Sequence, residues 1–491
     1  MGVLRTAIPV ATSLRLSASG RLTAVLAAVA ALIFSLAVGY AGAVAPWQLP
    51  AAALGGVILA ALGLRRPAFF VCALVFVRPL LDTFSNTTVG VQSANPAGLL
   101  SVGLIALCAA LPLSNRRLLL PRATVPFAVV VAVTAGSTAL AVFNFRSTVG
   151  MTPVAEAVRV AALLALYVLA ANVLGSPSRI RALVIVCGLS GVIPAVLGIA
   201  EFVDGAETVN SGLARISGPF NGPNPLGFYL AMTALVLIAT PSGWLSARVR
   251  LLALSPMLIA LVATYSRVGY VTFMVGLILL EGRRRKHVVA LVVVVVAATV
   301  ALVPTVRDRV FPQPDATTGQ ASYESFSWRI QNWADLLDKW TERPAVGFGT
   351  STAIVVNPRR PVSQLFDEAG GYEAHNLVVR VLVEGGVALL LVYVWLTVAL
   401  ARATRRLSRE RWELGPIVRL VTAMWIVLLI VGLGTDDPFQ QTAVMFVLLA
   451  LTGALEGLQS RRGQLRARAA ERRYRRSIGY LPQRAPQPSR V

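Results

Sequence analysis

The stretch ATVPFAVVVAVTAGSTALAVF, residues 123–143, contains no charged side chain. A helix of about 20 apolar residues is long enough to cross the hydrocarbon core of a bilayer. Similar stretches recur along the chain of 491 residues, of which 56% are hydrophobic and only 14% are charged. A water-soluble chain of this length needs more charge to cover its surface. Long apolar helices, rather than alternating ten-residue strands, also argue against an outer-membrane barrel.

The apolar stretches predict an all-α protein, a polytopic transmembrane helix bundle of about 12–14 spans. The predicted spans are residues 22–45, 49–64, 67–81, 97–113, 123–143, 154–173, 181–203, 223–240, 250–265, 267–282, 287–304, 376–400, 416–434 and 438–457. The second, third, ninth and tenth are short enough to be buried or re-entrant segments instead. We interpret the first as a retained span, because it is long for the apolar core of a signal peptide.

Basic residues occur mainly in short clusters between the apolar stretches. If the N-terminus is cytoplasmic and the spans alternate, these clusters and the two tails become cytoplasmic and hold most of the 45 basic residues. Such an excess in short cytoplasmic loops is typical of membrane proteins. Arginine far outnumbers lysine, which together with abundant Ala and Val indicates a GC-rich bacterial source. We therefore predict a multi-pass protein of the bacterial cytoplasmic (inner) membrane with both termini in the cytoplasm.

This orientation divides the chain into five segments. They are a cytoplasmic N-tail (1–21), a transmembrane bundle of about eleven spans (22–304), an exterior loop (305–374), the last three spans (375–457) and a basic cytoplasmic C-tail (458–491). A net charge of +23 alone would suggest nucleic acid as a partner. Its distribution favours membrane lipid instead, and we interpret the C-tail as an anchor at anionic lipid.

The exterior loop contains one predicted amphipathic helix, residues 322–340. Its apolar stripe recurs at steps of three and four residues and consists of Phe326, Ile330, Trp333, Leu337 and Trp340. Arg329, Asn332 and Asp335 are expected to lie off this stripe. The stripe could lie on the outer leaflet or pack on the helix bundle, and the sequence leaves both open.

Two arginines are candidates for binding phosphate, because a guanidinium group can donate two parallel hydrogen bonds and stays charged. Arg215 begins a segment rich in Gly, Pro and Asn that includes Asn224 and extends to Gly227. Arg267 lies in a very short break between two predicted spans and must therefore be close to the membrane surface. For each arginine the alternative is a simple turn with its side chain among the lipid headgroups.

His375 is the candidate for proton transfer. With Asn376 it opens the span after the exterior loop, and histidine can accept a proton near neutral pH. The alternative is an ordinary polar residue at the membrane interface. The other histidine, His287, follows a basic cluster and is interpreted as an anchor. Neither CxxC nor HExxH spacing occurs, so no metal site is expected.

Four blocks of the sequence, taken in order, resemble the O-antigen ligase and O-antigen polymerase superfamily of bacterial membrane glycosyltransferases. The blocks are Arg215–Gly227, Ser266–Gly269, Arg329–Gly349, and His375–Asn376 followed by Glu384–Gly386. Val268 stands where the family more often has glycine. Their order, and the long exterior segment before the His-Asn pair, carry the resemblance over about residues 210–395.

The resemblance implies glycosyl transfer on the outer face of the membrane. The donor is then a glycan on undecaprenyl pyrophosphate, and the acceptor is a hydroxyl group of a lipid or cell-wall glycan, with no cofactor and no metal. His375 would be the catalytic general base, and Arg215, Arg267 and Arg329 would bind the pyrophosphate. The supporting residues are Asn224, Asn376, Arg159, Arg380 and Glu384. Glu156 and Arg159 are also spaced to pair with each other on a helix.

Two alternatives to a ligase stay open. A polymerase of the same superfamily would use another lipid-linked repeat as the acceptor. A flippase or transporter would move the lipid-linked glycan without bond chemistry. A flippase needs polar residues deep in the bundle and on both sides of a pathway. The candidates here cluster near the outer ends of the spans, which favours the enzyme.

Overall fold

The computed structural model describes residues 66–84, 96–110, 118–205, 208–210, 213–281, 287, 290, 326–358, 373–409, 414–433 and 442–477. The predicted N-tail, the spans at 22–45 and 49–64, and nearly all of the span at 287–304 lie outside these residues. The end of the C-tail and two parts of the exterior loop, 305–325 and 359–372, lie outside them as well.

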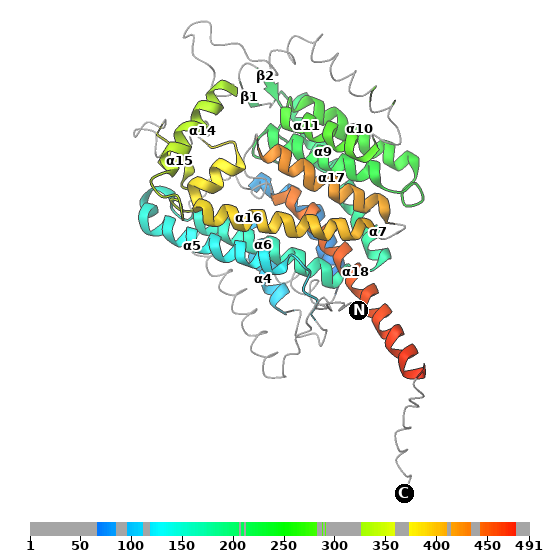
Figure 1. Cartoon of the computed structure of the whole chain (residues 1–491). Coiled ribbons are helices and arrows are strands. Elements are labelled where there is room, and N and C mark those ends of the chain that lie inside the picture. Colours follow the sequence, from blue (N-terminus) through cyan, green and yellow to red (C-terminus); the bar gives the residue numbers. More distant parts are fainter. Residues whose placement is uncertain are drawn as a thin grey trace, which may run out of the picture.

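Helices form most of the described structure, and every predicted span within it coincides with one helix or with two consecutive helices (Figure 1). The helices are α3 (Pro67–Val77), η1 (Arg78–Phe84), α4 (Pro96–Ala110), α5 (Thr124–Val149), α6 (Thr152–Val173), α7 (Pro177–Leu189), α8 (Val192–Val203), α9 (Pro223–Ala239), α10 (Ala247–Ala263), α11 (Arg267–Glu281), α14 (Phe326–Trp340), α15 (Ala353–Val356), α16 (Leu377–Arg409), α17 (Gly415–Gly432) and α18 (Thr442–Ser477). Within the described ranges the one sheet is an antiparallel hairpin of β1 (Thr208–Asn210) and β2 (Leu213–Arg215).

Six helical segments are long and apolar enough to cross a membrane, judged by length and composition. They are Thr124–Val149, Thr152–Val173, Pro177–Val203, Leu377–Leu407, Gly415–Gly432 and Thr442–Glu471. Shorter apolar helices at Pro67–Leu81, Leu100–Ala109 and Pro223–Ala239 accompany them. The predicted fold class, an all-α polytopic helix bundle, is confirmed.

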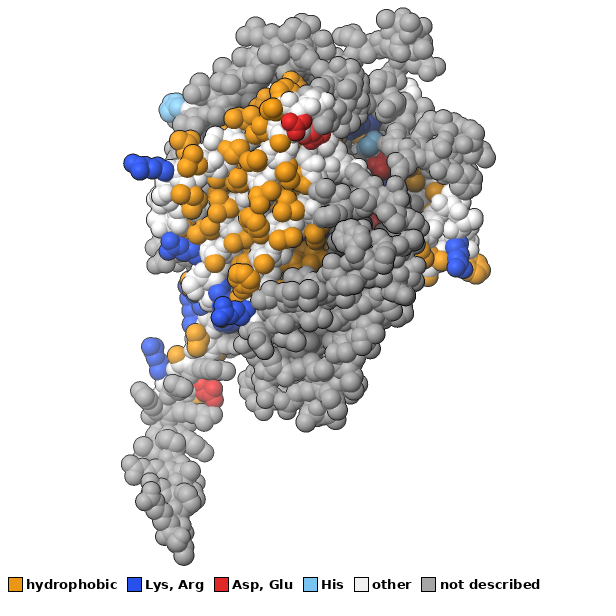
Figure 2. All heavy atoms as spheres, turned by 180° about the vertical axis from the view of Figure 1, so that it is seen from behind, with side chains coloured by type: hydrophobic (Ala, Val, Ile, Leu, Met, Phe, Trp, Pro, Cys, Tyr) orange, Lys and Arg blue, Asp and Glu red, His pale blue; other side chains and the backbone are white. Residues whose placement is uncertain are grey.

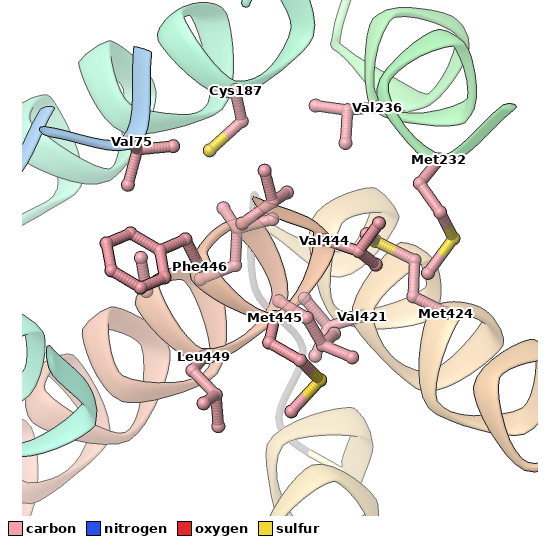
Figure 3. Close-up of a cluster of buried hydrophobic side chains, with 14 of the residues drawn as sticks. Val75, Cys187, Met232, Val236, Val421, Met424, Val444, Met445, Phe446 and Leu449 are labelled. Carbon is pink, nitrogen blue, oxygen red and sulfur yellow. The ribbon is translucent and has the colours of Figure 1, made fainter. Parts of the chain in front are cut away.

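The core of the bundle surrounds α9 and the first half of α18. Almost every residue of α9 is buried, and so is every residue of α18 from Thr442 to Leu458. A helix that is apolar on all sides is stable only when other helices surround it. Figure 3 shows side chains from α3, α7, α9, α17 and α18 meeting in this core, among them Val75, Cys187, Met232, Val421 and Phe446.

Helices α6 and α18 pack closely against each other, and small residues allow the approach. A Cβ atom on Gly457 would lie 2.1 Å from the carbonyl oxygen of Ala171, and one on Gly453 would lie 2.4 Å from that of Tyr167. The two glycines form a small-xxx-small pattern of the kind that lets helix backbones touch within membranes. At the same interface the Tyr167 hydroxyl donates to the Glu456 carboxylate at 2.5 Å.

Two sets of contacts mark the two ends of the bundle. At one end, the backbone N–H of Arg122 donates to Glu456 at 3.0 Å, and the Asn172 amide donates to the Leu119 carbonyl at 2.8 Å. The hairpin, α14 and α15 lie at the opposite end, away from the C-terminal part of α18 (Figure 1). The hairpin, α14 and α15 belong to segments predicted to be exterior, and these three elements lie at the same end of the bundle.

Candidate active site

The first group of candidate residues, which we call the arginine turn, consists of Arg215, Asn224 and the segment Thr264–Arg267. Arg215 is the last residue of β2 and is only 2% exposed. Its Nε donates to the carbonyl oxygen of Thr264 at 3.0 Å, and its Nη2 donates to Asn224 Oδ1 at 3.1 Å and to the Tyr265 carbonyl at 3.5 Å. None of these three acceptors carries a charge, so these bonds position the guanidinium group through neutral oxygens.

Ser266 connects the arginine turn to α11. Its hydroxyl donates to Asn224 Oδ1 at 3.1 Å and accepts the backbone N–H of Gly269 at 3.2 Å, which makes it the N-cap of that helix. Arg267 follows as the first residue of α11 and is partly buried. The Arg-Gly-Pro-Asn block and the Ser-Arg block of the sequence are therefore one structural unit.

Glu201, near the C-terminal end of α8, fixes the chain that follows Arg215. Its carboxylate accepts the backbone N–H groups of Ser217 at 2.9 Å and of Gly218 at 2.6 Å. Gly218 has a φ of 53°, a conformation that residues with a Cβ rarely adopt. Sequence reasoning assigned Glu201 no role, because its acceptor function depends on backbone groups that only the fold brings to it.

The second group, which we call the histidine turn, consists of residues 373–384 at the start of α16. His375 is partly buried and has a left-handed backbone with a φ of 47°. Asn376 caps α16: its Oδ1 accepts the backbone N–H groups two and three residues on, at 2.9 and 3.2 Å. Its Nδ2 donates to the Leu433 carbonyl at 2.9 Å. Asn376, which follows the histidine directly, thus connects the start of α16 to the end of α17.

Arg380, in the histidine turn, bridges two buried carboxylates, one on α6 and one on α16. Its Nη2 donates to both oxygens of Glu156 at 3.2 Å, and its Nε donates to Glu384 at 3.0 Å. Glu156 is 8% exposed, Glu384 is 6% exposed, and the Ser351 hydroxyl also donates to Glu156 at 2.6 Å. The sequence suggested Arg159 as the partner of Glu156, and it gave no signal for Ser351. Glu156 and Arg380 are 224 residues apart, so local spacing could not reveal their contact.

The glycine motifs of the third and fourth sequence blocks form one contact. Helix α16 is broken at Gly386, whose φ is 65°, and the turn Pro344–Gly349 packs into the break. The backbone N–H of Gly349 donates to the Glu384 carbonyl at 2.8 Å. A Cβ on Gly386 would lie 2.3 Å from the carbonyl carbon of Ala345. These glycines are therefore required for two backbones to meet beside the Arg380 network.

Helix α14 packs on the bundle next to the histidine turn. Leu336 is fully buried, in a cluster that includes Phe348, Ala374, Val379 and Val383. The indole Nε1 of Trp333 donates to the Ala374 carbonyl at 2.6 Å. Of the two arrangements that the sequence left open for the apolar stripe, packing against the bundle is the one the structure has.

The predicted orientation of α14 is wrong in one respect. Asn332, expected off the apolar stripe, is fully buried: its amide donates to the Glu373 carbonyl at 3.1 Å and accepts from Asn357 at 2.8 Å. Ile330, expected on the stripe, is 48% exposed. The packed face is rotated because partners from residues 357 and 373 satisfy a buried amide, which hydrophobic periodicity does not consider. Arg329, one turn before Asn332, is partly buried.

Helix α17 connects the two groups of residues. It packs against α11, which starts with Arg267, and against α16, and its C-terminal end accepts the bond from Asn376. Arg159 lies on α6 one turn after Glu156 and is partly buried. Of the predicted residues, Arg215 and Asn224 therefore belong to one hydrogen-bonded group and Asn376, Arg380 and Glu384 to another, with α17 between the two groups.

Left-handed backbone conformations occur at both groups. Among the described residues, the non-glycine residues with positive φ are Tyr265 (46°), Ser351 (60°) and His375 (47°). Each such residue costs about 1–3 kcal/mol, and such strain is concentrated at functional sites. One lies in the arginine turn, one donates to Glu156, and the third is the candidate base itself.

A bundle of apolar helices with buried arginines, carboxylates and a strained histidine at one end defines a multi-pass membrane protein with a polar site at that end. Residues 252–394 match the family model described as O-Antigen ligase. The match confirms the resemblance to the O-antigen ligase and polymerase superfamily and indicates a glycosyltransferase-like enzyme. It contains Arg267, Arg329, His375, Arg380 and Glu384, whereas Arg215 and Asn224 precede it and bond to residues inside it. No curated protein matches the chain.

Proposed function

We propose that the protein transfers a glycan from an undecaprenyl-pyrophosphate carrier to an acceptor hydroxyl, in the manner of an O-antigen ligase. The reaction takes place at the end of the bundle that holds the arginine turn and the histidine turn. The observation that carries the proposal is the left-handed histidine, His375, held between the α14 contact at Ala374 and the Asn376 cap. A strained residue fixed on both sides is typical of a group that must be oriented for chemistry.

His375 is the general base of this reaction. It takes the proton of the acceptor hydroxyl as the oxygen attacks the anomeric carbon of the donor. A carbon–oxygen bond forms, the bond to the pyrophosphate oxygen breaks, and the lipid pyrophosphate leaves with the bonding electron pair. Direct attack of this kind inverts the anomeric configuration.

Arginines stabilise the pyrophosphate as its negative charge increases in the transition state. Arg267 and Arg329 are the direct contacts that we propose. Arg215 is buried and bonded to the chain, so its main contribution is to fix the turn that presents Arg267 and to add a positive charge near it. Asn224 joins Arg215 to Ser266 and is part of the same support.

The other predicted residues support the base. Asn376 fixes the start of α16, and the Arg380 and Glu384 pair holds its first two turns against Glu156 of α6. Arg159 lies one turn along α6 from that network. These residues act through the position of the histidine turn and need not touch the substrate.

The orientation of the site follows from charge. If the basic loops are cytoplasmic, the site end faces the exterior of the inner membrane, both termini are cytoplasmic, and residues 305–374 form an exterior loop. A reporter fused near Thr318 should give an exterior signal. A cytoplasmic signal there would reverse the placement of the site and remove the proposed access to an exported donor.

Transfer can be tested with purified protein in liposomes. Lipid-pyrophosphate-linked oligosaccharide and a hydroxyl-bearing acceptor glycan are added in the presence of a chelator, and the transferred product is measured. Product formation supports the proposal. Movement of the lipid-linked glycan across the bilayer without any product would instead support a flippase.

The acceptor separates a ligase from a polymerase. Liposomes are prepared once with the lipid-linked oligosaccharide alone and once with the oligosaccharide plus a lipid or cell-wall glycan. A ligase requires the second glycan, whereas a polymerase extends the lipid-linked oligosaccharide in its absence.

A further inference from the structure

A cavity lies at the opposite end of the bundle, away from the arginine and histidine turns. It has a volume of about 180 Å³ and is lined by the ends of α9 and α11 and the first turns of α10 and α17. Its polar lining includes Thr240, Ser242, Arg250, Glu281 and Arg419. The cavity thus combines charged groups from three different helices, α10, α11 and α17.

Arg250 is held at the wall of this cavity by one strong bond. Its Nη2 donates to the Thr240 carbonyl at 2.7 Å. Its Nε is buried, and in the part of the chain that the structure describes no acceptor is bonded to it. A buried donor that lacks an acceptor is costly and indicates a missing partner, here one that carries acceptor oxygens.

The charges that line the cavity favour an anion. Arg250 and Arg419 together contribute two positive charges, and Glu281 contributes one negative charge. The remaining charge of one positive unit matches a phosphodiester, which has one negative charge and two acceptor oxygens. Arginine suits phosphate because its planar group can donate two hydrogen bonds at once.

Apolar surface directly beside the cavity points to a lipid as the source of the phosphate. Leu251 and Leu252, next to Arg250, are 70% and 72% exposed. Ile278 and Leu279, just before Glu281, are 45% and 41% exposed. Figure 2 shows a broad hydrophobic face of the molecule with basic side chains at its margins. A phosphate in the cavity would therefore have its acyl chains along an apolar surface.

We infer that this cavity binds the phosphodiester headgroup of an anionic membrane phospholipid, with Arg250 and Arg419 as ligands. Basic pockets between helices at the cytoplasmic side of a membrane suit such headgroups. The site is separate from the proposed transfer reaction. A lipid bound there would contact α9, α10, α11 and α17 and stabilise their packing at the end opposite the arginine turn.

The inference is tested by native mass spectrometry of the intact protein in detergent, titrated with phosphatidylglycerol and, separately, with phosphatidylcholine. The wild-type protein should retain phosphatidylglycerol in preference to phosphatidylcholine. The double variant R250Q/R419Q should bind phosphatidylglycerol roughly tenfold more weakly. The matched control is R248Q/R402Q, which removes the same charge from two exposed arginines that do not line the cavity. The control should retain wild-type affinity.

Two single variants guard against misfolding. Arg419→Gln leaves the Arg250–Thr240 bond intact and should still weaken phosphatidylglycerol binding severalfold. Glu281→Gln removes the negative charge of the cavity and should strengthen binding, which a misfolded protein would not do. Equal losses in R250Q/R419Q and R248Q/R402Q would overturn the inference, as would equal retention of the two lipids. Retention of inorganic phosphate without phosphatidylglycerol would identify a small-anion site and overturn the lipid assignment.

Discussion

The arginine turn and the histidine turn each contain a hydrogen-bonded arginine, but the two arginines have different surroundings. Arg215 donates to two backbone carbonyls and an amide oxygen, all neutral. Arg380 donates to two carboxylates, Glu156 and Glu384. The second arginine therefore lies in an ion-pair network, whereas these bonds position the first through neutral oxygens. Sequence alone cannot make this distinction, because both residues are simply arginines near the ends of apolar helices.

We infer that the two turns have different functions, one in binding the donor and the other in positioning the base. The arginine turn joins Arg215 and the start of α11 with Arg267 in one hydrogen-bonded unit, and two arginines in one unit suit binding and stabilising a diphosphate. The histidine turn uses its arginine to lock α16 against α6, which suits holding a base in position. Variants of the arginine turn should therefore mainly change the KM for the donor, and variants of the histidine turn should mainly change kcat.

The largest effect is expected at the proposed base. His375→Ala should lower kcat for transfer by about a hundredfold to ten-thousandfold, because the acceptor hydroxyl loses its proton acceptor. The KM for the lipid-linked donor should change little. The measurement is steady-state transfer in liposomes, with His287→Ala as the matched control. Unchanged transfer by the His375 variant would refute its assignment as the base.

Next in size is the loss of the proposed phosphate contact. Arg267→Gln should raise the KM for the lipid-linked donor roughly tenfold to a hundredfold, because a charged hydrogen bond to pyrophosphate is lost. The KM is measured from transfer rates at increasing concentrations of the lipid-linked donor. Arg343→Gln, which changes an exposed arginine in the segment before α15, should keep the wild-type KM. An equal rise in both variants would indicate general surface charge and not a specific contact.

A smaller effect on donor binding, with an added loss of stability, is expected for Arg215→Lys. Lysine keeps the charge but cannot reach the Thr264, Tyr265 and Asn224 acceptors from a planar group. We expect transfer to fall about tenfold and the free energy of unfolding to fall by about 1–3 kcal/mol. Thermal unfolding in detergent measures the second change. A Lys variant with wild-type stability and activity would show that the fork geometry of Arg215 is not needed.

The smallest effect on transfer is expected in the histidine turn. Glu156→Gln leaves Arg380 paired with Glu384 but removes one of its two carboxylates. The free energy of unfolding should fall by about 1–3 kcal/mol, with only a severalfold loss in kcat. Glu342→Gln breaks an exposed pair with Lys339 and should cost less than about 1 kcal/mol. A Glu156 variant that loses donor binding instead of kcat would contradict the division between the turns.

Much of the site could be predicted from sequence because its motifs are local. Gly, Pro and Asn mark the chain breaks at residues 215–227, and Ser266 precedes Arg267 at the start of a helix. Ser266 and Asn376 could both be expected to cap a helix, because Ser and Asn side chains accept hydrogen bonds from the free N–H groups of a helix start. The sequence could not reveal the contacts of Glu201, Glu156 and Ser351, because their partners are distant in the chain or are backbone groups.

The amphipathic helix shows where periodicity fails. The pattern correctly predicted a helix within residues 305–374, observed as α14. It placed Ile330 inward and Asn332 outward, but Asn332 is the buried residue of the two. Periodicity ranks side chains by hydrophobicity, whereas a buried amide is stable when its hydrogen bonds are made. Asn357 and the carbonyl of Glu373 make those bonds, and only the folded loop brings them together.

By itself the sequence determined the membrane bundle, because long apolar helices have no stable alternative in water and basic loops bias their orientation. It also determined which short motifs break the helices. Only the tertiary structure decided that Arg215 bonds to neutral oxygens and Arg380 to two carboxylates. The physical reason is that a hydrogen bond depends on distance and direction in space. The sequence does not give the distance or direction between two residues that are 224 positions apart.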